Sequence, residues 1–336
     1  MEYRTLGASG LRISPICLGA MMFGGATDAA TARRIVARAR DQGVNFIDTA
    51  NAYNGGASEE VVGRAIADAP GWWVLATKIA NPFGPGPNER GLSRRAVTQA
   101  IDASLARLGI GTIDLLYLHK EDHATPLAET VDALGQAMRA GKLRYFGVSN
   151  YRAWRVAEIC RLCDAAGIAR PIASQPLYNA LNREVEIEHL PACAALGLGV
   201  VPYSPLARGV LTGKYPPDSA PEAGSRAARG DKRLLESEWR PESLAIAQEI
   251  AAHARTRGVQ PGQFALAWVL HNKLIAGAVC GPRTETQWEE YVAALDYRFT
   301  PEDEALIDRL VVTGHASSPG HNDPAYPIEG RKPRGA

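Results

Sequence analysis

The chain has 336 residues, 46% of them hydrophobic and 22% charged, which excludes a disordered or collagen-like protein. Its 37 basic and 36 acidic side chains nearly cancel, so no overall charge favours nucleic acid or an anionic membrane as a partner. The amino terminus lacks a signal-peptide pattern, no apolar run is long enough to span a bilayer, and five cysteines are too few for a disulfide scaffold. We therefore expect a cytoplasmic protein.

Eight short apolar runs alternate with amphipathic segments, after a first segment that has turns between Gly7 and Gly10. Runs that are apolar nearly throughout are typical of parallel strands buried on both faces. Their alternation with helices predicts an α/β fold, a (β/α)8 TIM barrel with an N-terminal β-hairpin, in a single domain over residues 1–336. Helices should begin near residues 28, 58, 93, 126, 151, 184, 242 and 284. The eight runs are SPICLGA, VNFIDTA, WWVLATK, IDLLYLH, LRYFGVS, PIASQP, LGVVPYS and LIAGAVCG.

Three stretches interrupt this alternation. Residues 81–92 are rich in glycine and proline, and residues 204–240 form a long connection with several basic side chains. Both follow strands, and barrel enzymes build their active sites from loops at the carboxyl ends of the strands, so we expect long loops with lid or clamp roles there. The third stretch, residues 314–336, has little periodicity and is predicted to be an irregular C-terminal tail.

Reactive side chains stand where three of the predicted strands end. Asp48 ends one strand, Lys78 the next and His119 the one after, while Tyr53 lies in the loop that follows Asp48. Each residue alone has an ordinary structural explanation, such as a helix cap for the aspartate. In a barrel, however, all four would project into one pocket at the carboxyl ends of the strands.

The chemistry of these four residues is complementary. The ordinary pKa of tyrosine, near 10, makes Tyr53 a weak proton donor at neutral pH, and an ammonium such as that of Lys78 would lower it. Asp48 would offset the cost of burying that ammonium, and His119 could hydrogen-bond a substrate carbonyl. The result is a proton-donating site with no evident acyl nucleophile. Reduction of a carbonyl needs such a site when another group supplies hydride.

The sequence resembles the aldo-keto reductase superfamily over essentially its whole length. The resemblance implies a (β/α)8 barrel, NAD(P)H-dependent reduction of an aldehyde or ketone, and Tyr53 as general acid, tuned by Lys78 and Asp48 beside a substrate-orienting His119. The strings that carry it are VNFIDTANAY, GGASEEVVGRAI, LATK, IDLLYLHK, GKLRYFGVSN, SQPLYN, VPYSPLARGVLTGKY and GPRTETQWEEY.

The same resemblance implies positions for a nicotinamide cofactor. Ser149, Asn150 and Gln175 match residues that hydrogen-bond the nicotinamide amide, and Tyr203 matches the aromatic residue that stacks on its ring. The positions that match the pyrophosphate cradle are Ser204, Pro205, Leu206 and Gly209. Gly281, Arg283 and Gln287, in the last matching string, belong to the predicted cofactor site as well.

The cofactor end can also be considered from the residues alone. No GxGxxG fingerprint occurs, so a dinucleotide would not be held in the Rossmann manner. Thr284 to Gln287 reads as a capping box that opens a helix, and the planar cation of Arg283 precedes it. A helix start with an adjacent arginine suits a phosphate, although a simple capped helix has the same pattern. We expect NADPH rather than NADH, with Arg283 on its 2′-phosphate.

Other functions remain open at this point. A cofactor-sensing regulatory subunit on the same fold, like the family members that attach to potassium channels, could keep the same residues. The pair His119 and His123 does not indicate a metal site, because the strand ends at His119 and no cluster of carboxylates stands at ligand spacing. The expected partner is a small-molecule carbonyl substrate, and a sugar-like ketone is as compatible as a small aldehyde. Nothing in the sequence indicates an oligomeric state.

Overall fold

The computed structural model describes residues 1–217 and 220–327. The chain forms two compact units. The first comprises residues 1–177, 188–203 and 272–292, and the second comprises residues 178–187, 204–271 and 293–336. The organisation of residues 1–336 as one domain stays a prediction.

The first unit contains the eight parallel strands, in the order β10-β3-β4-β5-β6-β7-β8-β9. Val200 pairs with Ile275, and the Val279 N–H donates to the Pro202 carbonyl at 2.9 Å, so the two ends of the sheet meet. The predicted (β/α)8 fold is thereby confirmed, and each strand coincides with one of the eight apolar runs, with β5 extending one residue past its run to Ile79. The strands are β3 (Ile16–Gly19), β4 (Phe46–Asp48), β5 (Val74–Ile79), β6 (Ile113–Leu118), β7 (Leu143–Ser149), β8 (Ala173–Gln175), β9 (Gly199–Val200) and β10 (Ala278–Cys280).

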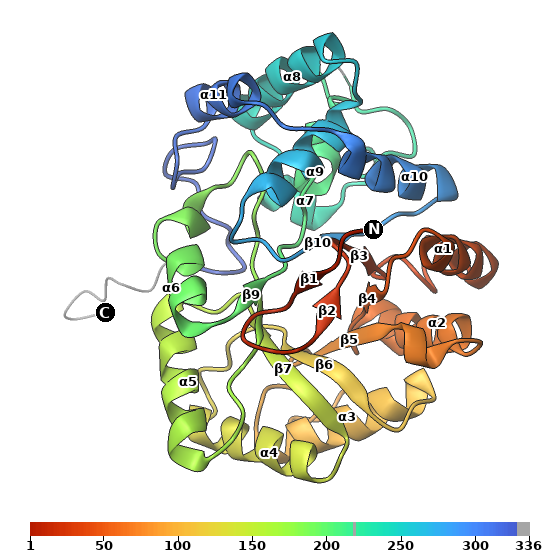
Figure 1. Ribbon diagram of the computed structural model, residues 1–336, viewed down its shortest axis with the longest axis vertical. Helices are drawn as coiled ribbons and strands as arrows, with labels where there is room; N and C mark the ends of the chain where they lie inside the picture. Colours follow the sequence, from red (N-terminus) through yellow and green to blue (C-terminus); the bar gives the residue numbers. More distant parts are fainter. Residues whose placement is uncertain (218–219, 328–336) are drawn as a thin grey trace. The chain divides into compact units, whose positions relative to one another are not determined.

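Helices follow the strands and lie on the outer side of the sheet (Figure 1). Asp28 and Ser93 cap the first and third of them by accepting backbone N–H bonds, as their positions in the sequence favour. The helix predicted near residue 184 begins five residues later, since Pro191 suits the first turn of a helix but not its interior. The helices are α1 (Ala29–Asp41), α2 (Ala57–Ile66), α3 (Arg94–Leu108), α4 (Leu127–Arg139), α5 (Ala153–Ala166), α6 (His189–Leu196) and α10 (Glu285–Ala293), which belongs to this unit as far as Val292.

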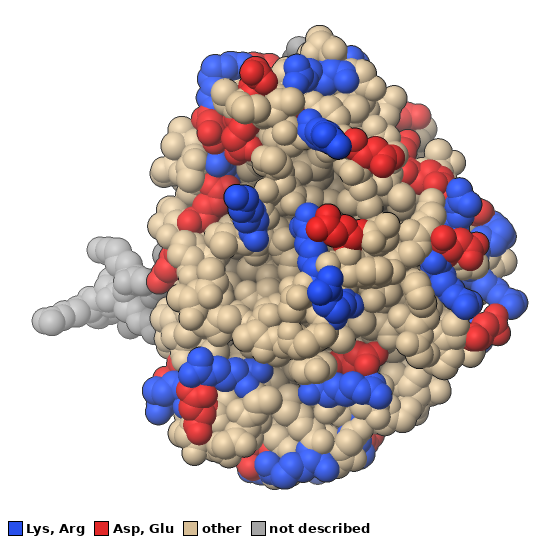
Figure 2. Space-filling view, viewed as in Figure 1, with Lys and Arg blue, Asp and Glu red and all other residues tan. Residues whose placement is uncertain are grey.

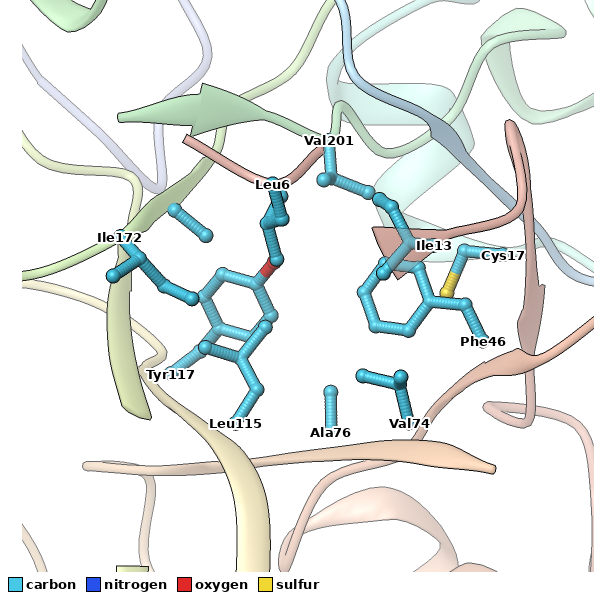
Figure 3. Packing of buried hydrophobic residues seen from close by; sticks show 11 residues of the cluster. Leu6, Ile13, Cys17, Phe46, Val74, Ala76, Leu115, Tyr117, Ile172 and Val201 are labelled. Atoms are coloured by element: carbon cyan, nitrogen blue, oxygen red, sulfur yellow. The ribbon is translucent and has the colours of Figure 1, made fainter. Parts of the chain in front are cut away.

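The predicted hairpin, β1 (Arg4–Thr5) with β2 (Arg12–Ile13), covers the amino-terminal end of the strands. Leu6 and Ile13 are fully buried beside Phe46, Tyr117 and other side chains from the strands (Figure 3). Gly7 makes this close approach possible, because its φ of +57° is left-handed and a Cβ there would lie 2.2 Å from the carbonyl oxygen of Ile172. The carboxyl ends of the strands are thus the end left for a functional site.

The second unit is helical. Its helices are α7 (Lys232–Glu236), α8 (Pro241–Thr256), α9 (Pro261–His271) and α11 (Pro301–Leu310). Of these, α8 was expected, whereas α7, α9 and α11 were not. Helix α9 was missed because it is apolar on every side and therefore shows no amphipathic period. The connection over residues 204–240, predicted to be irregular, contains α7 and a 3₁₀ turn, η4 (Ala207–Thr212). Residues 314–327 form neither helix nor strand, and the rest of the predicted tail lies outside the described residues.

The surface is mixed in charge. On the face shown in Figure 2, basic and acidic side chains alternate without a large region of one sign. None of the helices in the described ranges is both long and apolar enough to cross a membrane.

Candidate active site

Three of the four predicted reactive side chains meet at the carboxyl ends of β4 and β5. The Lys78 ammonium is fully buried and forms an ion pair with Asp48, which is itself 1% exposed. It also donates to the Thr49 carbonyl at 2.9 Å and lies 3.3 Å from the hydroxyl of Tyr53. Tyr53 begins a 3₁₀ turn, η1 (Tyr53–Gly56), which follows β4 and turns the phenol back over the lysine. The structure therefore brings the phenol and the amine into direct contact.

The fourth residue, His119, follows β6 directly. Its ring packs edge-on against the ring of Tyr53, with 5.8 Å between the centroids. Its backbone is fixed on both sides, because its N–H donates to the Ile79 carbonyl at 2.8 Å and its carbonyl accepts from the Asn150 amide at 2.9 Å. The amide nitrogen of Asn81 lies 3.0 Å from ring nitrogen Nδ1. All four predicted residues are thus assembled at one end of the barrel.

Hydrogen bonds continue from this group to the ends of the next strands. Gln175, at the end of β8, donates to the second carboxylate oxygen of Asp48 at 3.0 Å. The Gln175 carbonyl accepts from the Ser149 hydroxyl at 2.8 Å, and that hydroxyl accepts from Asn150. The hydroxyl of Tyr203 donates to Asn150 at 2.8 Å. The residues expected to meet a nicotinamide therefore form one network with the reactive group.

Burial and charge set the protonation states in opposite ways at Lys78 and His119. Burial lowers the pKa of Lys78, but the neighbouring Asp48 and Tyr53 outweigh it, so the pKa is raised and the ammonium stays charged. Burial lowers the pKa of His119 to about 3, and the cations Lys78 and Lys120 lower it further in the same direction. The site therefore holds a charged amine and a neutral imidazole at neutral pH.

Comparison with known proteins bears on this arrangement. The sequence model described as Aldo/keto reductase family matches residues 15–312, nearly the whole chain. The chain belongs to the aldo/keto reductase family.

Relatives of this aldo/keto reductase are described with different roles. It is similar to a "Probable voltage-gated potassium channel subunit beta" from Arabidopsis thaliana, with 37% identity over 88% of this chain and 92% of the relative. It is 33% identical to the "L-glyceraldehyde 3-phosphate reductase" of Escherichia coli K12, over 94% of this chain and 93% of the other. It is also 31% identical to the "Versiconal hemiacetal acetate reductase" of Aspergillus parasiticus, over 93% of this chain and 97% of the relative. Family and relatives together identify an oxidoreductase enzyme, of a family that generally uses NAD(P)H on small carbonyl compounds.

The remaining predicted cofactor residues of the reductase fall in both units. In the first unit, Gly281 follows β10, and the next helix begins with the expected cap, since the Gln287 N–H donates to the Thr284 hydroxyl at 3.2 Å. The Gln287 side chain accepts from the N–H of Arg283, one residue earlier than in a standard capping box. In the second unit, the predicted cradle residues are Ser204, Pro205, Leu206 and Gly209.

The cradle segment of the reductase has an unusual backbone. Ser204, Ala207, Arg208 and Gly209 all have left-handed φ angles, between +46° and +98°. The side chain of Lys214 lies against Gly209, where a Cβ would be 3.2 Å from its ammonium. Sequence reasoning assigned no role to this lysine, and the glycine backbone that it meets carries no signal.

Sequence reasoning also missed the side chains that hold the loop below Tyr53. The Ser58 hydroxyl donates to the Ala20 carbonyl at 2.7 Å and bonds Thr49, whose carbonyl accepts from Lys78. Beside it, Glu59 is fully buried and paired with Arg107 of α3 at 2.7 Å. The string GGASEEVVGRAI contained these residues, but only the fold shows which partners they meet.

Two histidines of the reductase with lowered pKa values should make its stability fall in mild acid. Burial lowers the pKa of His119 to about 3 and that of His189 to about 4, against 6.5 for an ordinary histidine. Below about pH 6.5 the unfolded chain binds protons that the folded chain does not, so stability is lost as the pH falls toward 4. Each histidine contributes a slope of at most about 1.4 kcal/mol per pH unit.

Urea unfolding at pH 7, 6 and 5 measures this effect. Among the described residues, the His189 ring hydrogen-bonds only the Ser174 hydroxyl, so His189→Gln removes one titrating group at a small change in shape. The variant should lose about 1 kcal/mol per pH unit less than the wild type between pH 6 and 5. If the free energy of unfolding falls with pH equally steeply in the variant and the wild type, His189 does not stay neutral in the folded protein.

Proposed function

We propose that this aldo/keto reductase reduces an aldehyde or ketone to an alcohol with hydride from NADPH, and that Tyr53 is the general acid. The observation that carries the proposal is the contact of 3.3 Å between the Tyr53 hydroxyl and a fully buried ammonium that Asp48 pairs. The positive charge stabilises phenolate, so the phenol gives up its proton more readily than a solvated tyrosine would.

The roles of the other residues follow from this geometry. Asp48 offsets the burial of Lys78 and, through Gln175, links it to the neighbouring strand. His119 is neutral, so it can donate one hydrogen bond to a substrate carbonyl oxygen without competing for the proton of Tyr53. The carbonyl oxygen would then lie between imidazole and phenol. As negative charge develops on that oxygen, Tyr53 supplies the proton and Lys78 stabilises the phenolate left behind.

The residues around the group suit a nicotinamide cofactor, which when bound supplies the hydride. The amide and hydroxyl groups of Ser149, Asn150 and Gln175 stand within the same network as Asp48, and these are the groups that can recognise a carboxamide. The half-buried ring of Tyr203 is fixed by its bond to Asn150, so one aromatic face is held in a set orientation. The part of residues 204–209 in cofactor binding stays a prediction from the sequence.

Arg283 should give a preference for NADPH over NADH. Within the described ranges, no hydrogen bond or ion pair engages its guanidinium, and the residue precedes the capped start of α10. A planar cation of this kind pairs strongly with a phosphate. We expect Arg283→Ala to reduce the ratio of kcat/KM for NADPH to that for NADH about tenfold or more, which corresponds to about 1.4 kcal/mol.

A matched arginine controls that measurement. Arg38 of α1 bonds Glu289 of α10 on the exposed surface, so Arg38→Ala alters the same helix without removing the predicted phosphate contact. It should leave the cofactor ratio unchanged. An Arg283→Ala enzyme with the wild-type ratio would reject the assignment of the 2′-phosphate to this residue.

The reaction itself is tested by following NADPH absorbance over a panel of small aldehydes, sugar ketones and polycyclic ketones. The proposal expects turnover on at least one class of carbonyl compound. Turnover that persists unchanged in Tyr53→Phe would exclude the site described above as its source.

A second function has one observation in its favour. Two relatives, which are 37% and 36% identical to this chain, are described as probable voltage-gated potassium channel beta subunits. A cofactor-sensing regulatory subunit would bind NADPH tightly and show no oxidation of it across the whole carbonyl panel. The same absorbance assay, combined with a cofactor titration, therefore separates the two functions.

A further inference from the structure

The contact between Asn81 and His119 is not part of the reaction scheme above. Asn81 is the second residue after β5, at the start of the glycine- and proline-rich loop over residues 81–92. Its amide nitrogen lies 3.0 Å from Nδ1 of His119. Among the described residues, it is the one group that hydrogen-bonds a ring nitrogen of this histidine.

A neutral imidazole carries its proton on one nitrogen and accepts with the other. If the amide N–H of Asn81 donates to Nδ1, that nitrogen holds a lone pair and the proton is on Nε2. Only this tautomer can donate a hydrogen bond from Nε2 to a carbonyl oxygen. The opposite orientation of the amide would place the proton on Nδ1 and leave Nε2 with nothing to donate.

The other groups around the ring decide its charge but not its tautomer. Lys78 and Lys120 are cations that disfavour a second proton, and the burial of the ring acts in the same direction. Tyr53 meets the ring edge-on, and Asp48 is already paired with the lysine. The surroundings of the ring thus keep it neutral, whereas the hydrogen bond from the Asn81 amide determines which ring nitrogen carries the proton.

The backbone holds both partners of this bond in place. Ala80, between β5 and Asn81, has a φ of +116°, a conformation that residues other than glycine rarely adopt. Its carbonyl accepts from the Gly91 N–H at 2.9 Å, which ties the loop back on itself. Strain of this kind persists only where the surroundings enforce it, and here it fixes the direction in which Asn81 leaves the strand.

We propose that Asn81 is a positioning residue that selects the Nε2–H tautomer of His119 and thereby enables His119 to donate to the substrate carbonyl. The statement about the tautomer concerns the protein alone. The statement about the donated bond rests on the proposed function.

The tautomer is measured directly by 15N NMR of the histidine side chains in the full-length protein, with the His119 signals assigned by comparison with His119→Gln. The expected result is a neutral ring with its proton on Nε2 between pH 5 and 9. In Asn81→Asp the carboxylate accepts from Nδ1, so the proton should move there and the ring should become easier to protonate. A wild-type ring with its proton on Nδ1 would overturn the proposal, whether or not the protein reduces carbonyl compounds.

Kinetics supply the second readout. At pH 8, kcat/KM of Asn81→Asp should fall about tenfold or more, because the neutral ring can no longer donate from Nε2. The loss relative to wild type should shrink toward pH 6, where the doubly protonated ring recovers a donor. Asn88→Asp places the same charge on an exposed position of the same loop and should match the wild type at both pH values. If kcat/KM of Asn81→Asp is lower than that of the wild type by the same factor at pH 6 and pH 8, Asn81 has only a structural role.

Discussion

Replacement of Tyr53 by phenylalanine should lower kcat for carbonyl reduction by about 10² to 10⁴-fold, the range typical of a lost general acid. The change removes one oxygen, 3.3 Å from Lys78, and leaves the ion pair of that lysine with Asp48 intact. The affinity for NADPH, measured by fluorescence titration, should change less than about twofold, because the lost hydroxyl acts on the substrate oxygen rather than on cofactor binding.

Tyr145→Phe is the matched control for this experiment. Tyr145 lies near the amino end of β7, where it packs against the core cluster, so its hydroxyl is remote from the reactive end of the strands. The control should retain wild-type kcat. If Tyr53→Phe keeps more than about a tenth of wild-type kcat, another group donates the proton and the role of the phenol is refuted.

Replacement of Lys78 by methionine should abolish turnover and lower the free energy of unfolding by about 3 to 5 kcal/mol. The side chains of Lys78 and Asp48 are 0% and 2% exposed, so the variant leaves a buried carboxylate without its counter-charge. Gln175 alone, which donates to the other oxygen of Asp48, cannot replace the lost ammonium. Urea unfolding at neutral pH measures the loss.

The double variant Asp48→Asn, Lys78→Met separates stability from catalysis. Without a charge on either side, most of the lost stability should return, because the asparagine oxygen can still accept from Gln175. Turnover should not return, since no cation remains beside Tyr53. Lys142→Met breaks a surface pair with Asp102 and should cost less than about 1 kcal/mol. A loss of stability at Lys78 as small as that at Lys142 would show that the pair is not buried in solution.

The barrel could be predicted because its signals are local. Each of the eight strands coincides with an apolar run, most of these runs are followed by an amphipathic segment, and a single residue such as Asp28 marks where a helix starts. The missed helix α9 lacks that signal. Every position of α9 from Phe264 to Val269 is buried, so no polar stripe marks it in the sequence. The delayed start of α6 depends on one proline whose effect is visible only in context.

The candidate site could likewise be predicted where its residues stand at strand ends. Asp48, Lys78 and His119 stand at strand ends, and parallel strands bring their ends together whatever the details of packing. Asn81 could not be found in this way. It lies in a loop whose composition indicates only turns, and its partner is 38 residues away. The positive φ of Ala80, which sets the direction in which Asn81 leaves β5, has no signature in the sequence either, since alanine occurs in every kind of backbone.

The hairpin that closes the amino end of the barrel has a practical consequence. Met1 is 44% exposed and lies near Gly43, in the turn that precedes β4, whereas the reactive side chains are at the opposite end of that strand. A fusion tag or a surface linker attached at Met1 would therefore project away from the reactive side chains. Immobilised enzyme coupled through this terminus should keep its access to carbonyl compounds.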